Sequence, residues 1–250
     1  MDLKLAGRTY LITGGSRGLG LATAQALVAD GAKVVLAARN SDSLNDAVEL
    51  LGGNDNAVGV AVDIGKPETV EALISTALER FGRLDGALLS VGGPPGGAIT
   101  TIKEEQWMAS FETVFLGPLR LALKVSEAVT EGGAIAFVLS SSVRAPIANL
   151  AISNGLRPGL AMAAKTLADE LGPQGIRVFG LLPGRIDTDR TRELDSSDPK
   201  RRPNAEAMIP LRRYGQPCEF GEVAAFLLSP VASYVTGVMV AIDGGAIRSL

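Results

Sequence analysis

The amino-acid sequence predicts an α/β fold made of one domain, in which a doubly wound parallel sheet of about seven strands carries helices on both faces. Short apolar runs alternate with helical patterns from one end of the chain to the other. Continuous apolar strands separated by helices are typical of a parallel sheet covered on both sides. The chain has 250 residues, of which 46% are hydrophobic, so it can bury one large core. We therefore expect residues 1–250 to form one domain.

The apolar pattern places each element along the chain. The expected strands are Thr9–Thr13, Lys33–Ala38, Ala57–Val62, Gly86–Ser90, Ala134–Leu139, Arg177–Leu182 and Val238–Ile242. The expected helices, which have apolar residues at helical spacing, are Gly18–Asp30, Asp42–Leu51, Pro67–Phe81, Lys103–Thr130, Leu156–Leu171 and Glu219–Leu228.

The first expected strand runs directly into the glycine-rich stretch TGGSRGLG, Thr13 to Gly20, and then into an Ala- and Leu-rich helix. A turn of small residues here lets backbone N–H groups and the helix N-terminus face the pyrophosphate of a dinucleotide. The second strand, KVVLAAR, also stands where a Rossmann-type fold requires it. The alternative is a purely structural glycine turn. We assign cofactor binding to Gly14, Ser16, Arg17, Gly18, Leu19 and Gly20.

Charge at the end of the second strand predicts which dinucleotide binds. An acidic residue there would accept from the ribose 2′-hydroxyl and favour NAD, but this chain has Ala37, Ala38 and Arg39. Arg17 adds a second guanidinium within the glycine loop, and two guanidinium groups suit a 2′-phosphate. The sequence therefore predicts NADP(H); the alternative is that both arginines are solvated surface residues.

A polar and highly charged segment, Asp187 to Asn204, breaks the apolar pattern. Ligands bind beyond the carboxyl ends of the strands in such folds, so we expect a mobile substrate lid near residues 187–215. Between Arg185 and Arg213 the chain has 8 basic and 6 acidic residues, a small excess that is typical of a solvated face. The weaker hypothesis is that some of these arginines contact a phosphate-bearing acyl carrier or coenzyme A.

The composition excludes several function classes. A formal net charge of −3 argues against nucleic acid or an anionic membrane as a partner. The chain has no histidine, which excludes a histidine-containing triad and a histidine zinc site, and we expect no metal. Cys218 is the only cysteine, so no internal disulfide can form. The sequence shows no signal peptide and no long apolar run, and we expect a cytoplasmic protein.

Several motifs together resemble the short-chain dehydrogenase/reductase family over nearly the whole chain: TGGSRGLG, VDI, LDGALLSVGG, GGAIAFVLSSS, ELGPQGIRVFGLLPGRIDT and YVTGVMVAIDGG. Within the family the chain is most similar to 3-oxoacyl-acyl-carrier-protein reductase-like members. The resemblance implies a nicotinamide cofactor, hydride transfer between that cofactor and a small-molecule carbonyl or alcohol, and a homotetramer. It also implies further cofactor-binding residues, namely Asp63, Ile64, Ser90, Gly92, Arg157, Pro183, Gly184 and Ile186.

The catalytic positions that the resemblance implies are altered in this chain. Family members carry a serine after the fifth strand, then a tyrosine, then a lysine four residues later. The tyrosine and lysine positions fall at Ser153 and Arg157, and a family asparagine position falls at Val114. The serine is retained in the run Ser140 to Ser142, from which we assign Ser141 and Ser142 to the catalytic site together with Ser153 and Arg157.

The altered pair changes the expected chemistry. A serine hydroxyl is a far weaker acid than a phenol, and an arginine stays protonated and cannot relay protons. Arg157 can still bind the nicotinamide ribose and stabilise an oxyanion. Tyr214 and Arg144 are candidate substitutes, whereas Tyr10 and Tyr234 are expected to be packed. Two interpretations remain open: an oxidoreductase with a rebuilt proton-transfer group, and a nucleotide-binding pseudoenzyme or regulatory subunit without turnover.

Pro158 bears on the geometry of the altered pair. It cannot donate to the carbonyl of Asn154, and its ring disfavours a regular turn there. We therefore expect the helix to begin near Gly155 or Leu156, with Ser153 in the preceding loop.

Two helical regions are apolar on more than one face, the long helix around Trp107 to Val129 and the helix after Ser153. Such helices seldom face water on their outer side. Together with the family resemblance, this pattern predicts a homotetramer.

Overall fold

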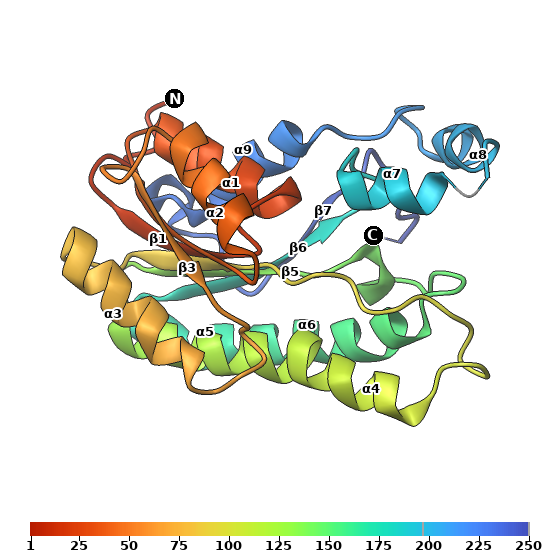
Figure 1. Cartoon of the computed structure of the whole chain (residues 1–250), viewed down its shortest axis with the longest axis horizontal. Coiled ribbons are helices and arrows are strands. Elements are labelled where there is room, and N and C mark those ends of the chain that lie inside the picture. The colour runs from red at the N-terminus through yellow and green to blue at the C-terminus, as the bar shows by residue number, and fades with distance from the viewer. Residues whose placement is uncertain (197, 250) are drawn as a thin grey trace.

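The computed structural model describes residues 1–196 and 198–249, and there a seven-stranded parallel sheet lies between two layers of helices (Figure 1). The strand order is β3-β2-β1-β4-β5-β6-β7. The strands are β1 (Thr9–Thr13), β2 (Lys33–Ala38), β3 (Ala57–Ala61), β4 (Gly86–Leu89), β5 (Ala134–Val138), β6 (Arg177–Pro183) and β7 (Met239–Ile242). Every predicted strand is present and the predicted fold class is confirmed; residues 197 and 250 of the predicted domain lie outside the described residues.

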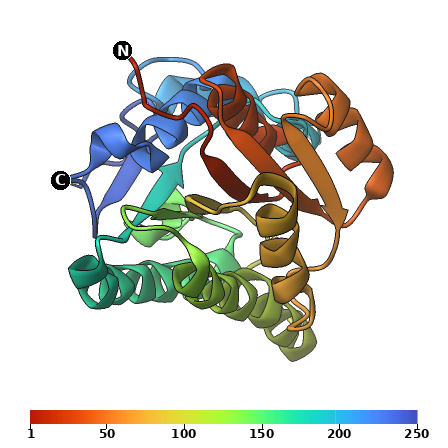
Figure 2. The same ribbon diagram turned by 90° about the vertical axis from the view of Figure 1, so that its left-hand side faces the viewer.

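The helices cover both faces of the sheet (Figure 2). One layer contains α1 (Gly18–Ala29), α2 (Ser41–Leu50) and α9 (Pro217–Leu228), and the other contains α3 (Thr69–Phe81), α4 (Glu104–Ser110), α5 (Gly117–Ala128) and α6 (Ala151–Leu171). Within residues 1–196 and 198–249, no helix combines the length and the apolar character needed to cross a membrane.

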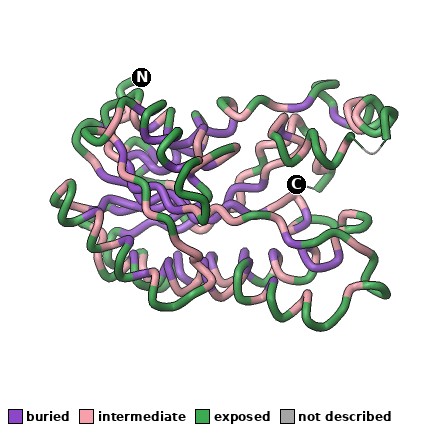
Figure 3. The backbone as a smooth tube through the Cα atoms, in the orientation of Figure 1, coloured by how far each residue is buried: buried purple, intermediate pink, exposed green. Residues whose placement is uncertain are grey.

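Alternating strand side chains build one hydrophobic cluster on each side of the sheet. Ile12 and Leu36 pack under α1, α2 and α9, whereas Leu11 and Val35 pack over α3, α5 and α6. The central strands β1, β4 and β5 are buried along their whole length, in the middle of the molecule (Figure 3). The strand order reverses between β1 and β4, and in such sheets ligands bind at the carboxyl ends of the strands beside this reversal.

The single helix predicted over Lys103–Thr130 is interrupted. A π-helical turn, Phe111–Leu116, joins α4 to α5, and Val114 is buried within it. Trp107 of α4 lies against α6 so closely that a Cβ at Gly155 would be 2.8 Å from its ring. Gly155 therefore permits close helix packing rather than a loose turn. π-Helical turns occur frequently at functional sites.

Helix α6 begins at Ala151, so the prediction that it starts near residue 155 or 156 is wrong. Ser153 is not in a loop: it lies on the same continuous helix as Arg157, and Pro158 lies inside that helix. The two altered catalytic positions therefore share one helical face, as residues four apart on a helix do.

Tertiary hydrogen bonds explain why Pro158 does not break the helix. The Ala151 amide donates to the Gly97 carbonyl at 3.2 Å. The Asn154 side chain donates to the Ile147 carbonyl at 2.8 Å and accepts from the Ile147 amide at 3.0 Å. These bonds hold the first turn in place, and the proline removes only one intrahelical hydrogen bond.

The charged segment predicted as a lid contains two short helices that were not predicted from the sequence, α7 (Asp189–Asp195) and α8 (Arg201–Met208). Ion pairs connect them: Asp187 binds Arg192 at 2.8 Å and Arg202 at 3.1 Å. Because the stabilising contacts are ionic, no apolar stripe marks these helices in the sequence. The mobility of this lid remains a prediction, and its residue 197 lies outside the described part.

A charged cluster closes the amino ends of β1 and β4. The buried Asp85 carboxylate accepts from Arg8 at 2.7 Å, from the Thr9 amide at 2.9 Å, from Arg83 at 2.6 and 2.7 Å and from Thr130 at 3.1 Å. Burial alone would raise the pKa of Asp85, but the hydrogen bonds from Arg83 and Thr9 and the charges of Arg83 and Arg8 outweigh it and lower that pKa.

Candidate active site

The glycine loop brings the backbone of β1, α1 and β4 into close contact. A Cβ at Gly20 would lie 2.3 Å from the Gly14 carbonyl oxygen, and a Cβ at Gly14 would lie 2.9 Å from that of Ser90. Helix α1 begins at Gly18, and its N-cap residue Arg17 makes no capping hydrogen bond with its side chain. The first N–H groups of the helix are thus available to an anionic ligand, which suits the pyrophosphate of a dinucleotide.

The predicted cofactor positions at the other strand ends follow the same edge of the sheet. Thr13 Oγ1 donates to the Ser90 carbonyl at 2.7 Å and accepts from the Ser90 amide at 2.8 Å, which ties β1 to β4. Asp63 follows β3 and accepts from the Gly65 amide at 3.0 Å. Of the remaining predicted positions after β1, β3 and β4, Gly92 is exposed, and three are partly buried: Ser16, Leu19 and Ile64.

Arg17 and Arg39 lie free at the entrance to this edge. Arg39 follows β2 directly, and both side chains are exposed. Neither makes a hydrogen bond or ion pair with any residue that the structure describes. Two unpaired guanidinium groups beside the glycine loop are available to a phosphate.

The structure brings Ser142 and Ser153 together. Their Oγ atoms are 3.1 Å apart, within hydrogen-bond distance, and both residues are buried. Ser142 lies in a 3-10 turn, Ser141–Val143, that follows β5. Ser140 caps this turn, because its hydroxyl accepts from the Ser142 amide at 3.1 Å. Ser141 is half-buried and has no such contact with Ser153, so Ser142 is the serine that faces α6.

Arg157 lies one helical turn beyond Ser153 and is only 6% exposed. Its Nη1 donates to the Val138 carbonyl at the end of β5, at 2.8 Å. Burial, and to a lesser extent the charge of Arg190, lower the pKa of Arg157 to about 10. The guanidinium is therefore still protonated at neutral pH and presents a buried positive charge beside the two hydroxyl groups.

The segment after β6 supports the lid. Pro183 and Gly184 are half-buried, and a Cβ at Gly184 would lie 2.6 Å from Asp243. Ile186 is buried and forms an isolated bridge to Gly215. The predicted cofactor residues of this segment thus lie at the carboxyl edge of the sheet, between β6 and α7.

Arg190 is a candidate site residue that sequence reasoning missed. It lies in the first turn of α7, and its Nη2 donates to the Pro94 carbonyl at 3.3 Å. A Cβ at Gly93 would lie 2.5 Å from the same Nη2. Nothing in the local sequence separates Arg190 from the other lid arginines, because only the fold shows which of them reach β4.

Of the predictions made for the three tyrosines, one is confirmed and two are wrong. Tyr214 is buried and donates to Asp195 at 2.9 Å, so the prediction that it is free to reach a substrate is wrong. Tyr10 is buried, as predicted, whereas Tyr234 is 103% exposed and the prediction that it packs within the chain is wrong. Arg144 is exposed and makes no ion pair with a described residue.

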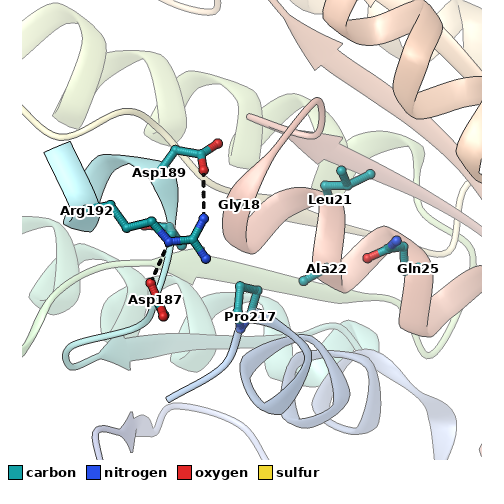
Figure 4. Close-up of a pocket in the computed structure, with 9 residues that line it drawn as sticks. Gly18, Leu21, Ala22, Gln25, Asp187, Asp189, Arg192 and Pro217 are labelled. Carbon is teal, nitrogen blue, oxygen red and sulfur yellow. Dashed lines mark hydrogen bonds and ion pairs between the residues drawn. The ribbon is translucent and has the colours of Figure 1, made fainter. Parts of the chain in front are cut away.

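A pocket of about 210 Å³ adjoins the glycine loop on the side of α9 (Figure 4). The Arg192 guanidinium lies at this pocket and bridges Asp187 and Asp189. Its lining residues include Gly18 of the loop and Pro217 of α9, but neither Ser153 nor Arg157. This pocket is therefore separate from the hydroxyl pair.

Comparison with known proteins identifies the family. The family model described as "Enoyl-(Acyl carrier protein) reductase" matches residues 14–246. The chain is 31% identical over 245 residues to a 3-oxoacyl-[acyl-carrier-protein] reductase of Vibrio cholerae, covering 97% of this chain and 98% of that protein. A solved short-chain dehydrogenase/reductase from Brucella melitensis has a TM-score of 0.94 at 28% identity, with complete coverage of both chains.

A second solved structure bears on the cofactor. L-sorbose reductase from Gluconobacter frateurii, complexed with NADPH and L-sorbose, has a TM-score of 0.91 and is 30% identical, again over 100% of both chains. The cofactor of this neighbour is the one that the sequence of our chain predicts. Motifs, fold and comparisons agree, and the chain belongs to the short-chain dehydrogenase/reductase family.

Proposed function

We propose that the protein is an NADP(H)-dependent oxidoreductase that interconverts the carbonyl and alcohol forms of a small molecule. The observation that carries this proposal is the buried pair of hydroxyl groups, Ser142 and Ser153, beside the Arg157 guanidinium at the carboxyl edge of the sheet. The comparisons support the reaction class, since the relatives quoted above are reductases or dehydrogenases by name.

The cofactor would lie across the carboxyl ends of β1, β2 and β4. The glycine loop from Gly14 to Gly20 would hold its pyrophosphate, and Arg17 and Arg39 would bind the 2′-phosphate. Asp63 would lie beside the adenine half, as the family resemblance implies. When bound, NADPH supplies the hydride that reduces the carbonyl carbon.

The hydroxyl pair would supply the proton. Ser153 would donate to the carbonyl oxygen, Ser142 would donate to Ser153, and water would restore the proton on Ser142. Because a serine hydroxyl is a weak acid, this relay depends on the Arg157 positive charge to stabilise the developing oxyanion. Arg157 itself keeps its proton throughout, since its pKa is about 10.

The proposal is tested by measuring binding before turnover. We expect one NADPH per chain in calorimetry, followed by oxidation of NADPH in the presence of members of a ketone and oxo-acid panel. Ser153→Ala should retain NADPH binding and reduce kcat by about 10² to 10⁴, as expected for loss of a proton-transfer group. Carbonyl reduction that is unchanged in Ser153→Ala would contradict the proposed relay.

A pseudoenzyme, the other interpretation of the sequence, gains no support from the comparisons. It predicts NADPH binding with no carbonyl reduction on any substrate. The same panel therefore separates the two functions. Acyl-carrier-linked thioesters belong in the panel, because three of the similar proteins are named 3-oxoacyl-[acyl-carrier-protein] reductase.

We also propose a homotetramer in the cytoplasm. Exposed apolar side chains lie on the outer face of the layer that holds α4, α5 and α6: Met108, Leu123 and Met162. A second group lies near β7, where Tyr234 and Val238 are exposed. Contact between chains would remove both groups from water. Light scattering at micromolar concentration should give the mass of four chains; a monomer would contradict this assembly.

A further inference from the structure

Two guanidinium groups lie near the carboxyl ends of β4 and β5. Arg157 comes from α6, in the lower layer of Figure 1, and donates to the carbonyl of Val138, the last residue of β5. Arg190 comes from α7, above the sheet edge, and contacts the Gly93 and Pro94 backbone after β4. Since β4 and β5 are adjacent parallel strands, the two groups enter one region from opposite sides.

Three acidic residues of the lid, Asp187, Asp189 and Asp195, have basic partners of their own. Asp187 pairs with Arg192 and Arg202, and Asp189 pairs with Arg192. Asp195 lies within 3.6 Å of Arg185 and 3.5 Å of Arg201, and it accepts from Tyr214. None of these carboxylates is therefore free to act as the counter-ion of Arg157 or Arg190.

Arg157 and Arg190 are left without a negative partner. Neither makes an ion pair with any residue in the described ranges 1–196 and 198–249. The charge of Arg190 contributes to the lowered pKa of Arg157, so the two groups repel one another across the site. Arg157 is a buried cation without a counter-ion, which is unfavourable, whereas Arg190 is exposed. An anionic ligand between the two would relieve their repulsion.

We propose that the substrate is an oxo acid, a compound whose carboxylate binds Arg190 and the free N–H groups of Arg157 while its carbonyl lies at Ser142 and Ser153. This inference rests on the proposed function. It adds a substrate class, and it assigns Arg190 as a specificity-determining residue. A guanidinium recognises a carboxylate through two parallel hydrogen bonds, which also fixes the orientation of the carbonyl.

The spacing of the groups sets how far the carboxylate lies from the carbonyl. Ser153 and Arg157 are four residues apart on α6, and such residues have Cβ atoms about 5–6 Å apart. A carbonyl and a carboxylate that are directly bonded, as in 2-oxo acids, or separated by one carbon atom, as in 3-oxo acids, stay within this distance of one another. The phosphate of an acyl-carrier arm is many bonds from the thioester carbonyl, so it could not contact Arg157 while the carbonyl lies at Ser153.

The first test uses a binding probe that cannot be reduced. Oxamate carries a carboxylate beside a carbonyl, and oxamide is its neutral counterpart. We expect the protein with bound NADPH to bind oxamate at least about tenfold more tightly than oxamide, the effect of one charge-assisted contact. Arg190→Gln should remove this preference and leave NADPH affinity unchanged. Arg201→Gln is the matched control, because this lid arginine is paired with Asp195 and should keep the preference.

A second measurement reads turnover with acetoacetate and its methyl ester. The ratio of kcat/KM for acid over ester should exceed about tenfold and fall toward one in Arg190→Gln. Equal affinity for oxamate and oxamide, or a preference unchanged in Arg190→Gln, would overturn the oxo-acid assignment. Reduction of carrier-linked thioesters without preference for the free acid would overturn it as well.

The design keeps the two proposals distinguishable. Failure to bind NADPH would refute the proposed function. The oxamate and oxamide titrations are also run without cofactor, so the difference in affinity between the two compounds is measured in either case. NADPH binding and ester reduction with no carboxylate preference would refute only the oxo-acid substrate.

Discussion

Two buried charged side chains at opposite ends of the parallel sheet, Asp85 and Arg157, differ in how far their charge is paired. At the amino ends of the strands, the Asp85 carboxylate receives hydrogen bonds from two arginines, one backbone amide and one threonine hydroxyl. At the carboxyl ends, the Arg157 guanidinium is 6% exposed, donates one hydrogen bond to a carbonyl and has a second positive charge nearby.

This difference distinguishes a structural cluster, around Asp85, from the site proposed for the chemistry, around Arg157. A buried charge whose partners are all in place contributes to the folded state, whereas an unpaired buried charge opposes it. The cluster around Asp85 therefore belongs to stability. Arg157 is retained in an unfavourable position, and we attribute that to what it binds. Substitution of Asp85 should therefore change the free energy of unfolding, and substitution of Arg157 should change kcat.

The largest effect is expected for Arg157→Met. Methionine fills a similar volume without the charge, so oxyanion stabilisation is lost and kcat should fall by about 10² to 10³. The free energy of unfolding should not decrease, because an apolar replacement of an unpaired buried ion is neutral or stabilising. NADPH oxidation assays and urea unfolding measure the two quantities. If Arg157→Met instead unfolded much more easily and kept its activity, Arg157 would be a structural residue rather than a catalytic one.

The opposite pattern is expected for Asp85→Asn. The substitution removes the charge that holds Arg8 and Arg83, and we expect unfolding to become easier by about 3 kcal/mol. Both arginines reach solvent, with side-chain exposures of 26% and 41%, which keeps the penalty near the lower end for a buried pair. Activity per folded molecule should be unchanged, since Asp85 lies at the edge away from Ser153. Urea unfolding with activity measured below the transition checks both statements.

What the sequence predicts correctly is local. The strands were found because each is a continuous apolar run, and the glycine loop because its small residues directly follow β1. A property that depends only on neighbouring residues can be read from the chain.

What the sequence missed depends on distant residues. The start of α6 is set by hydrogen bonds from Ala151 and Asn154 to the preceding loop, which outweigh the effect of Pro158. Helices α7 and α8 depend on ion pairs rather than an apolar stripe. Arg190 differs from other lid arginines only because the fold places it over Gly93.

Acid should weaken the amino-end cluster specifically. The folded pKa of Asp85 is lowered from its ordinary value of 3.8. Its contribution to stability is therefore fully present above that value and is lost as the pH falls through the lower folded pKa. The difference in unfolding free energy between wild type and Asp85→Asn should thus be constant from pH 7 to about pH 5 and shrink below pH 3.8. A difference that does not narrow under acid would show that the carboxylate charge is not the source of the stabilisation.

At the carboxyl end, Arg39→Ala should change cofactor selection without changing stability. Arg39 is exposed and unpaired, so its removal leaves no buried partner within the described chain. We expect wild type to bind NADPH at least about tenfold more tightly than NADH, and this ratio to fall by about tenfold in the variant. Calorimetry with both cofactors measures the ratio. Equal affinities in wild type, or a ratio unaffected by the substitution, would remove Arg39 from the phosphate site.

The smallest effect is expected for Pro158→Ala, and it tests whether the proline shapes the chemical end at all. The substitution restores an N–H that can donate to the Asn154 carbonyl and removes a ring from the helix interior. Alanine also leaves the unfolded chain more flexible, which offsets part of the gain. We expect a net increase in unfolding free energy of about 1 kcal/mol. Because Ser153 and Arg157 already share one continuous helix, kcat should stay within about twofold of wild type. A large change in kcat with little change in stability would instead mean that the proline sets the position of Arg157, and the carboxyl end would then hold a strained helix as well as an unpaired charge.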